Sequence, residues 1–162
     1  MTIQRLDSGI VSLGPLNAVL CELLRLILPS AQDDHPAAQA RLFPPPSGGS
    51  DDDLDADWKS YVEPDLRHIF QSSLEVIEQD LAALDQNPSG RRRDLRIPVS
   101  HLNAWIHGLN QARLALVARH RLTEAELEEH TAVDDEDRSF ALLQTHFYGL
   151  LQHSFLHELG DR

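Results

Sequence analysis

Apolar residues recur at three- and four-residue intervals along four long segments of the chain. These segments run from Pro15 to Pro29, from Pro64 to Leu84, from Ser100 to His120 and from Glu136 to Leu159. Residues three and four positions apart share one face of a helix, so we expect each segment to be an amphipathic helix. Four helices with one apolar stripe each can cover one another. The pattern therefore predicts an all-α, four-helix-bundle-like fold.

Three shorter segments complete this picture. The apolar residues around the turn-forming tripeptide Asp7-Ser8-Gly9 allow a short N-terminal β-hairpin over residues 2–13. Residues 123–126 have the spacing of a capping box and predict a short acidic helix. The prolines, glycines and aspartates of residues 44–57 predict an irregular, mobile loop. With 162 residues, the chain is expected to form a single helical domain over residues 1–162.

The charge, the apolar runs and the single cysteine of the chain indicate which classes of partner it can bind and in which compartment it is found. The formal net charge is -12 at pH 7, so the molecule repels the phosphates of nucleic acids and anionic membrane surfaces. The longest apolar run, residues 16–28, is shorter than the roughly 20 residues of a membrane span, and no secretory signal is recognisable. The one cysteine, Cys21, cannot form an internal disulfide. These features predict a cytoplasmic protein that binds neither nucleic acid nor membrane.

Several segments of the chain resemble a known bacterial family. They are Gly-Ile-Val-Ser-Leu at residues 9–13, Ala-Arg-Leu-Phe-Pro-Pro at 40–45, Glu-Pro-Asp-Leu-Arg at 63–67, Ala-Trp-Ile-His-Gly-Leu-Asn-Gln-Ala-Arg-Leu at 104–114 and Leu-Thr-Glu at 122–124. Together they are similar to the domain-of-unknown-function family numbered twenty-seventeen, and the resemblance spans nearly the whole chain. It implies an all-helical domain of unknown activity, often encoded near components that recruit substrates to a protease. It assigns no catalytic residue.

Three histidines form a stripe along the last predicted helix. His146, His153 and His157 lie within about 40° of one another at 100° per residue. His153 and His157, four residues apart, have the spacing to hold one divalent metal ion through their imidazole nitrogens. The stripe also borders the apolar face, where polar side chains are common. We therefore expect no metal and no other cofactor, and a metal site is the alternative.

Arg113 has an unusual position, because its helical angle places it among the apolar residues of the third predicted helix. A buried guanidinium needs partners, since an unpaired buried charge is costly. Asn110 lies one turn away, and Asp80 borders the apolar stripe of the second helix. We expect these three residues to form a polar network in which Arg113 is buried and bonded to a carboxylate, first Asp80 and next Glu63 or Asp65. The same arginine could instead grip a carboxylate or phosphate ligand.

The sequence contains no recognisable catalytic motif. It lacks a Gly-rich phosphate loop, a Gly-x-Ser-x-Gly nucleophile elbow and a nucleophile with a recognisable base. The aspartates of residues 51–57 alternate as in a calcium loop, but Ala56 and Val62 stand where that loop needs glycine and glutamate. We therefore expect a non-enzymatic helical interaction protein, with a regulatory or adaptor role and a protein partner. The alternative is a metal- or small-anion-binding domain that uses the histidine stripe or Arg113.

Overall fold

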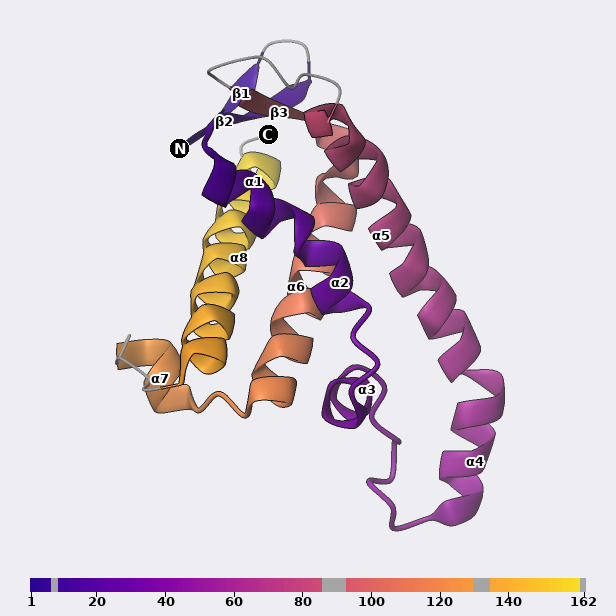
Figure 1. Ribbon diagram of the computed structural model, residues 1–162. Coiled ribbons are helices and arrows are strands. Elements are labelled where there is room, and N and C mark those ends of the chain that lie inside the picture. Colours follow the sequence, from indigo (N-terminus) through magenta and orange to yellow (C-terminus); the bar gives the residue numbers. More distant parts are fainter. Residues whose placement is uncertain (7–8, 86–92, 130–134, 161–162) are drawn as a thin grey trace.

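The computed structural model describes residues 1–6, 9–85, 93–129 and 135–160. A small antiparallel sheet lies at one end of the molecule, and the long helices extend from it (Figure 1). In the described part of the chain, no helix has both the length and the apolar character needed to cross a membrane. In chain order the elements are β1 (Thr2–Leu6), β2 (Ile10–Leu16), α1 (Ala18–Arg25), α2 (Ile27–Ala31), α3 (Pro36–Leu42), α4 (Asp52–Tyr61), α5 (Glu63–Asp85), β3 (Arg93–Pro98), the 3-10 turn η1 (Val99–His101), α6 (Leu102–His120), α7 (Glu124–Glu129) and α8 (Glu136–Gly160).

The sheet contains more than the hairpin that the sequence predicted. Within the described residues its strand order is β1-β2-β3, and β1 and β2 form the hairpin. β3 pairs antiparallel with β2, and Leu95 lies opposite Leu13. Leu95 and Ile97 are buried whereas Asp94 and Arg96 are exposed, which is the two-residue period of a strand with one covered face. The all-α prediction is therefore only approximately right.

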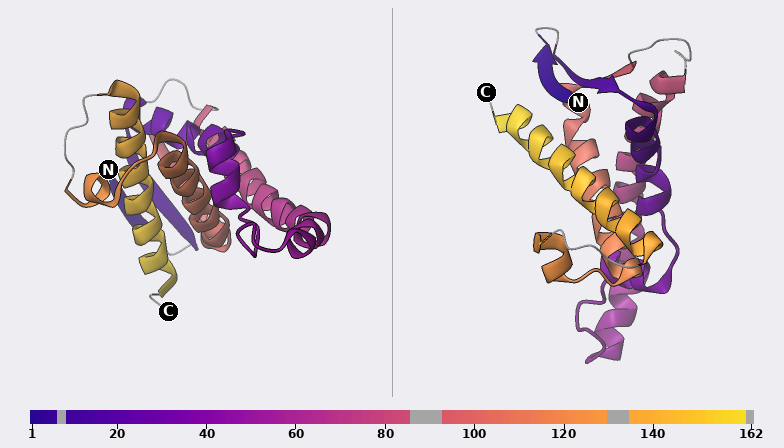
Figure 2. Two further views of the ribbon diagram at one scale, coloured as in Figure 1. Left: turned by 90° about the horizontal axis from the view of Figure 1, so that it is seen from below. Right: turned by 60° about the vertical axis from the view of Figure 1, so that its left-hand side comes forward.

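Helix α6 runs through the centre of the molecule, with α5 on one side and α8 on the other (Figures 1 and 2). The indole of Trp105 is fully buried and meets the Phe155 ring of α8 edge-on, with ring centroids 5.9 Å apart. On the α5 side, a Cβ at Gly108 would collide with Ile77, so glycine permits this close approach. The predicted four-helix bundle is not confirmed, because α6 separates α5 from α8 and the first helix is divided.

The division of the first predicted helix occurs at Leu26, between α1 and α2. Asn17 precedes α1, and its side chain accepts a hydrogen bond from the backbone N–H of Leu20. Pro15, expected in the first helical turn, lies in β2 instead. Pro29, expected to end the helix, lies in the first turn of α2, where its missing N–H would have no partner within the helix. The break allows α2 to pack against α6.

Part of the segment predicted as an irregular loop is helical. The N-cap of α4, Asp51, accepts a hydrogen bond from the backbone N–H of Leu54. Aspartates at 52, 53 and 55 fill the first turn, where negative charge interacts favourably with the helix dipole. The acidic run is therefore a helix start, and the irregular segment is shorter than expected. α4 and the first half of α5, residues 52–72, continue to the end of the molecule opposite the sheet (Figure 1), and we call them the arm.

Candidate functional site

A groove of about 500 Å³ lies between α3 and the arm. Gln39 and Phe43 line it from α3 and its C-terminal end, and Trp58, Lys59 and Arg67 line it from the arm. Phe43 and Trp58 are both partly buried, so each ring presents one portion to the solvent. The groove therefore combines aromatic surface with charged and amide side chains.

Arg67 joins the two walls of the groove. Its guanidinium carbon lies 3.8 Å from the centre of the Phe43 ring, which is a cation–π contact. Its Nε donates to Glu63 Oε1 at 2.7 Å, and its Nη1 donates to Gln39 Oε1 at 2.9 Å. Because Gln39 and Phe43 belong to the α3 side, these contacts fix the width of the groove.

A second hollow of about 350 Å³, here called the inner pocket, shares Phe43 and Arg67 with the groove. Phe43 and Phe70 form one wall, with ring centroids 5.4 Å apart. Leu42 and Leu74 add apolar surface, and both are buried. The inner pocket thus combines an apolar wall with glutamine side chains and Arg67.

Gln111 of α6 also lines the inner pocket and is only 3% exposed. Among the described residues, its Nε2 has no hydrogen-bond partner. A buried amide nitrogen without a partner costs about 1–3 kcal/mol, so its position at the edge of a hollow needs an explanation. A ligand that brought a carbonyl or carboxylate oxygen into the inner pocket would satisfy this nitrogen.

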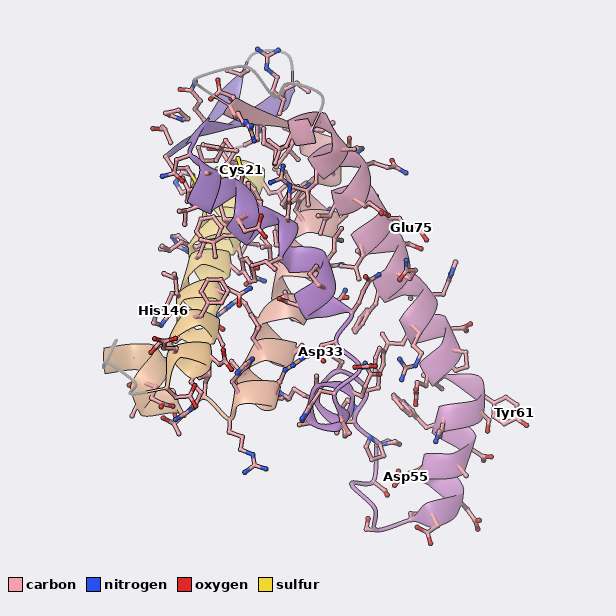
Figure 3. All side chains as sticks on the ribbon, in the orientation of Figure 1. Cys21, Asp33, Asp55, Tyr61, Glu75 and His146 are labelled. Carbon is pink, nitrogen blue, oxygen red and sulfur yellow. The ribbon has the colours of Figure 1, made fainter. Side chains whose placement is uncertain are left out.

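The loop that closes one end of the groove is held by Asp55. Its carboxylate accepts hydrogen bonds from the backbone N–H and the hydroxyl of Ser47, at 2.9 and 2.8 Å, and from the N–H of Gly49 at 3.0 Å. The bond from the Ser47 backbone is the main reason why the pKa of Asp55 lies below its usual value. In Figure 3 Asp55 points toward this loop, whereas Tyr61 points away from the body. Asp55 therefore has a structural role at the wall of the groove.

The outer surface of the arm is both apolar and acidic. α4 buries none of its residues, and Tyr61 is 77% exposed. Leu54, Val62 and Ile69 are also largely exposed. The acidic side chains of the arm are Asp52, Asp53, Asp55, Asp57, Glu63 and Asp65, against the basic side chains Lys59, Arg67 and His68.

The predicted bond between Arg113 and a carboxylate is absent from the described residues, so that prediction is wrong. Arg113 is only partly buried, and its Nη1 donates to the side-chain oxygen of Gln152 on α8 at 2.7 Å. The guanidinium lies against Gly149 of α8, and its Nε has no partner among the described residues. Asn110, the predicted third member, is exposed. The physical reason is angular: residues 105 and 113 lie about 80° apart on α6, which directs Arg113 toward α8 and away from α5.

Asp80 belongs to a different polar cluster, between α5 and α6. Its carboxylate accepts a hydrogen bond from Trp105 Nε1 at 2.8 Å and one from His101 Nδ1 at 3.0 Å. Trp105 is fully buried, so its indole N–H depends on this acceptor. Asp80 therefore anchors α5 to α6. The sequence signal for this contact was an aspartate beside the apolar stripe of one helix and a tryptophan in the apolar stripe of the next.

The three histidines of the predicted stripe do not meet at one point. His146 Nε2 lies 2.9 Å from the carbonyl oxygen of Leu127 on α7. His153 and His157 line a hollow beside β1, about 10 and 16 Å along the helix from His146 at 1.5 Å per residue. Among the described residues, no group of three His, Cys, Asp or Glu side chains is placed to hold a metal ion. Whether His153 and His157 bind a metal stays an open prediction.

Comparison with known proteins places the chain in a family. The model of the family described as a domain of unknown function (DUF2017) matches residues 11–159. The chain belongs to this family. No curated protein and no solved structure matches it. The family therefore supplies no activity, substrate or partner.

Three segments that carry the resemblance to this family meet at the inner pocket. Phe43 lies in the first of them, Arg67 in the second and Gln111 in the third, and all three line the inner pocket. Analysis of the sequence missed this site. A glutamine on the core-facing side of a helix was the available signal, but its partner residues come from segments 44 and 68 positions away, which periodicity cannot bring together.

Proposed function

We propose that this member of the DUF2017 family is a non-enzymatic protein-interaction domain, which binds a basic, partly apolar segment of another protein between α3 and the arm. The observation that carries this proposal is the groove, in which the partly buried rings of Phe43 and Trp58 lie beside charged side chains of the arm. None of the residues of α4 is buried, and large apolar side chains of the arm face the solvent. Short helices depend on packing for their stability, and contiguous exposed apolar surface is typical of binding sites.

The charge of the arm favours a basic partner. Six acidic side chains lie on residues 52–72 against Lys59, Arg67 and His68, so the arm is acidic as a whole, although Lys59 and Arg67 balance Asp55 and Glu63 within the groove. Such a surface attracts lysine and arginine side chains and raises their rate of encounter. The aromatic rings of Phe43 and Trp58 provide apolar contact for the remaining side chains of the same segment. An amphipathic basic peptide suits both properties.

The inner pocket supports a peptide as the ligand. Its volume of about 350 Å³ is sufficient for one large side chain. The unpartnered Nε2 of Gln111 needs an acceptor, and a peptide supplies carbonyl oxygens along its whole length. A partner that places one apolar side chain in the inner pocket and one carbonyl oxygen on Gln111 would make the amide a binding group. This is the kind of surface that an adaptor needs.

Selection from a random peptide library with the purified protein as bait tests the proposal. The selected peptides should combine lysine or arginine with aromatic or aliphatic residues. Trp58→Ala should weaken the best peptide about tenfold, because truncating an aromatic contact in a binding site typically costs more than about 1 kcal/mol. Val19→Ala, an apolar truncation at an exposed site on α1 remote from the groove, is the control and should bind as the wild type does.

Gln111→Leu separates binding from stability. Leucine removes the unpartnered amide at similar volume, so the free energy of unfolding should rise by about 1 kcal/mol. The same variant should bind the selected peptide more weakly than the wild type, because the donor for its carbonyl oxygen is gone. Urea denaturation and calorimetric titration measure the two quantities. Selected peptides without basic residues, or unchanged binding by both Trp58→Ala and Gln111→Leu, would contradict the proposal.

A further inference from the structure

The face of α8 that points away from α6 carries a second apolar surface. Leu143 and Leu150 are exposed there, and Leu150 is 67% exposed. Leu143 and Leu150 are seven residues apart and lie within about 20° of one another, which is the spacing of a helix–helix seam. Phe155, about 140° round the helix from Leu150, is fully buried and packs on Trp105 of α6, and Leu151 is fully buried too. α8 is therefore apolar on two sides and is covered on one; we call the exposed side the outer stripe.

The outer stripe lies in a part of the chain that has no charged residues. From Ser139 to His157, α8 contains no Asp, Glu, Lys or Arg, although these make up 25% of the whole chain. The molecule as a whole carries a formal charge of -12, so two copies repel each other over most of their surfaces. The outer stripe is a face on which two copies can approach without this repulsion.

The two flanks of the outer stripe carry opposite charges. The N-terminal half of α8 lies beside the acidic helix α7, since His146 contacts the Leu127 carbonyl. The C-terminal half lies beside β1, where Arg5 Nη1 donates to the carbonyl oxygen of Glu158 at 3.1 Å. In an antiparallel pair related by a two-fold axis, the α7 flank of one copy faces the β1 flank of the other. Acidic Glu124 would then approach Arg5 of the second copy.

We infer that the occupant of the outer stripe is a second copy of this chain, packed α8 against α8 in antiparallel orientation with Leu150 close to the two-fold axis. Such an interface is self-complementary, because each residue before the axis faces the corresponding residue after it. A stable dimer buries roughly 800 Å² of each partner, which Leu143 and Leu150 alone do not supply. The flanks α7 and β1 therefore belong to the same interface and fix its orientation.

This arrangement leaves the groove free in both copies. The arm and α8 lie on opposite sides of α6 (Figure 2), so the two arms of the dimer face outward. Two grooves on one particle can engage two segments of a partner at once, which strengthens binding without new contacts. The dimer itself does not depend on the function proposed for the groove.

Sedimentation velocity of the full chain over 5–200 µM, a range we choose to bracket a micromolar dissociation constant, tests the inference. The wild type should change from monomer to dimer within this range. Leu150→Glu should remain monomeric, because it places two carboxylates at the axis of the pair. Ile69→Glu adds the same charge to an exposed apolar site on the arm and should dimerise as the wild type does. Circular dichroism should show unchanged helicity for both variants, since both side chains are exposed.

Cysteine crosslinking tests the orientation. Residues 143 and 157 lie at equal distances from residue 150, so antiparallel pairing places them opposite each other. A mixture of Leu143→Cys and His157→Cys chains should therefore form a mixed disulfide faster than either variant forms one with itself, and the native Cys21 is buried and serves as the background in both. Arg5→Glu should raise the dissociation constant of the dimer about two- to fivefold, the range of an exposed ion pair.

Three results would overturn the inference. They are a wild type that stays monomeric at the highest concentration, a Leu150→Glu variant that dimerises like the wild type, and an Ile69→Glu variant that alone loses the dimer. Predominant self-crosslinking of Leu143→Cys would overturn the antiparallel orientation. Failure of the peptide selection leaves every one of these outcomes unchanged, so the two proposals are tested separately.

Discussion

The arm and the outer stripe of α8 both expose large apolar side chains, but they differ in charge. The arm surrounds its apolar residues with carboxylates, whereas the outer stripe lies in a segment without Asp, Glu, Lys or Arg. In a molecule with a net charge of -12, this difference decides which surface can cover each region. A basic segment of another protein suits the arm, and an identical copy suits the outer stripe. Apolar exposure indicates that a site exists, and the charge around it indicates the partner.

The two regions also differ in how they are supported. α8 rests on α6 with a continuous layer of buried residues, including Leu151 and Phe155. The arm is separated from α6 by the inner pocket, at which Gln111 keeps an unpartnered amide. Further along, α5 is held to α6 by the packing of Ile77 against Gly108 and by the hydrogen bond from Trp105 to Asp80. A partner in the groove can therefore stabilise the arm, while a dimer partner adds to a helix that is already held firmly.

The largest effect is expected from a change that weakens the support common to both regions. Asp80→Ala removes the acceptor of the buried Trp105 N–H and of His101. The free energy of unfolding should fall by about 2–4 kcal/mol, because a buried donor is stranded and two charge-assisted bonds are lost. Urea denaturation followed by tryptophan fluorescence measures this loss. Asp57→Ala removes an exposed carboxylate of the arm and should change stability by less than about 0.5 kcal/mol.

A loss in Asp80→Ala no larger than that in Asp57→Ala would show that the contact of Asp80 with Trp105 contributes little. A different contact would then have to stabilise both the arm and α8. Peptide binding and dimerisation of the folded fraction should be close to normal in this variant, since Asp80 lies in neither surface.

A smaller effect should distinguish the regions through their charge. Asp57→Lys reverses one of the six acidic charges of the arm, adjacent in sequence to the groove residues Ala56 and Trp58, and should weaken a selected basic peptide about fivefold, or about 1 kcal/mol. Glu75→Lys makes the same change on α5 outside the groove and serves as the matched control.

Raising the salt concentration should also weaken peptide binding, because exposed charges are screened. Dimerisation should be maintained or strengthened by salt, since screening reduces repulsion between two acidic copies. Peptide binding that is insensitive to both changes would contradict a charge-based role of the arm.

Much of the fold follows from local sequence patterns. The long helices were predicted to within a few residues, because their apolar stripes are strong and their ends carry ordinary signals. The capping box was also confirmed: the Thr123 N–H donates to Glu126 Oε2 at 2.7 Å, and the Glu126 N–H donates to Thr123 Oγ1 at 3.3 Å. β3 was missed because only Leu95 and Ile97 alternate with polar residues, a pattern too short to separate from a loop. α4 was missed because prolines and aspartates mark loops and helix starts alike.

The site was less predictable than the fold. Burial angles correctly singled out Arg113 as a polar residue facing into the molecule, but they could not indicate whether α5 or α8 lies on that side. The groove depends on contacts between α3, α5 and α6, such as Arg67 with Phe43, and no single helix contains a sign of them. Spacing along a sequence predicts which face of a helix is covered. It does not predict which helix covers it.

The smallest effect should come from acid, through the tie between α6 and the segment before α3. Asp33 is buried, and it accepts hydrogen bonds from the His35 N–H at 2.9 Å and from Arg119 Nη1 at 2.9 Å. Burial alone would raise the pKa of Asp33, but the His35 and Arg119 bonds outweigh it, and the pKa lies below its ordinary value of 3.8. A carboxyl with a lowered pKa stabilises the fold above its unfolded pKa, and this contribution is lost as the pH falls through the folded pKa.

Asp33→Asn should therefore be less stable than the wild type at pH 7 by about 1 kcal/mol, a modest value because the Arg119 side chain is half exposed. Between pH 7 and 5 the difference should be constant, because Asp33 is ionised in both the folded and the unfolded chain. Below about pH 4 it should shrink, since the wild type then protonates Asp33 on unfolding and loses its advantage. Urea midpoints at half-unit pH steps measure the difference. Subtracting the free energy of unfolding of the variant from that of the wild type removes the contributions of the other carboxylates. Because Asp33 positions α3 and hence one wall of the groove, acid should weaken peptide binding before it weakens the dimer. An Asp33→Asn curve parallel to the wild type down to pH 3 would mean that this tie does not contribute, and the groove would then owe its shape to Arg67 alone.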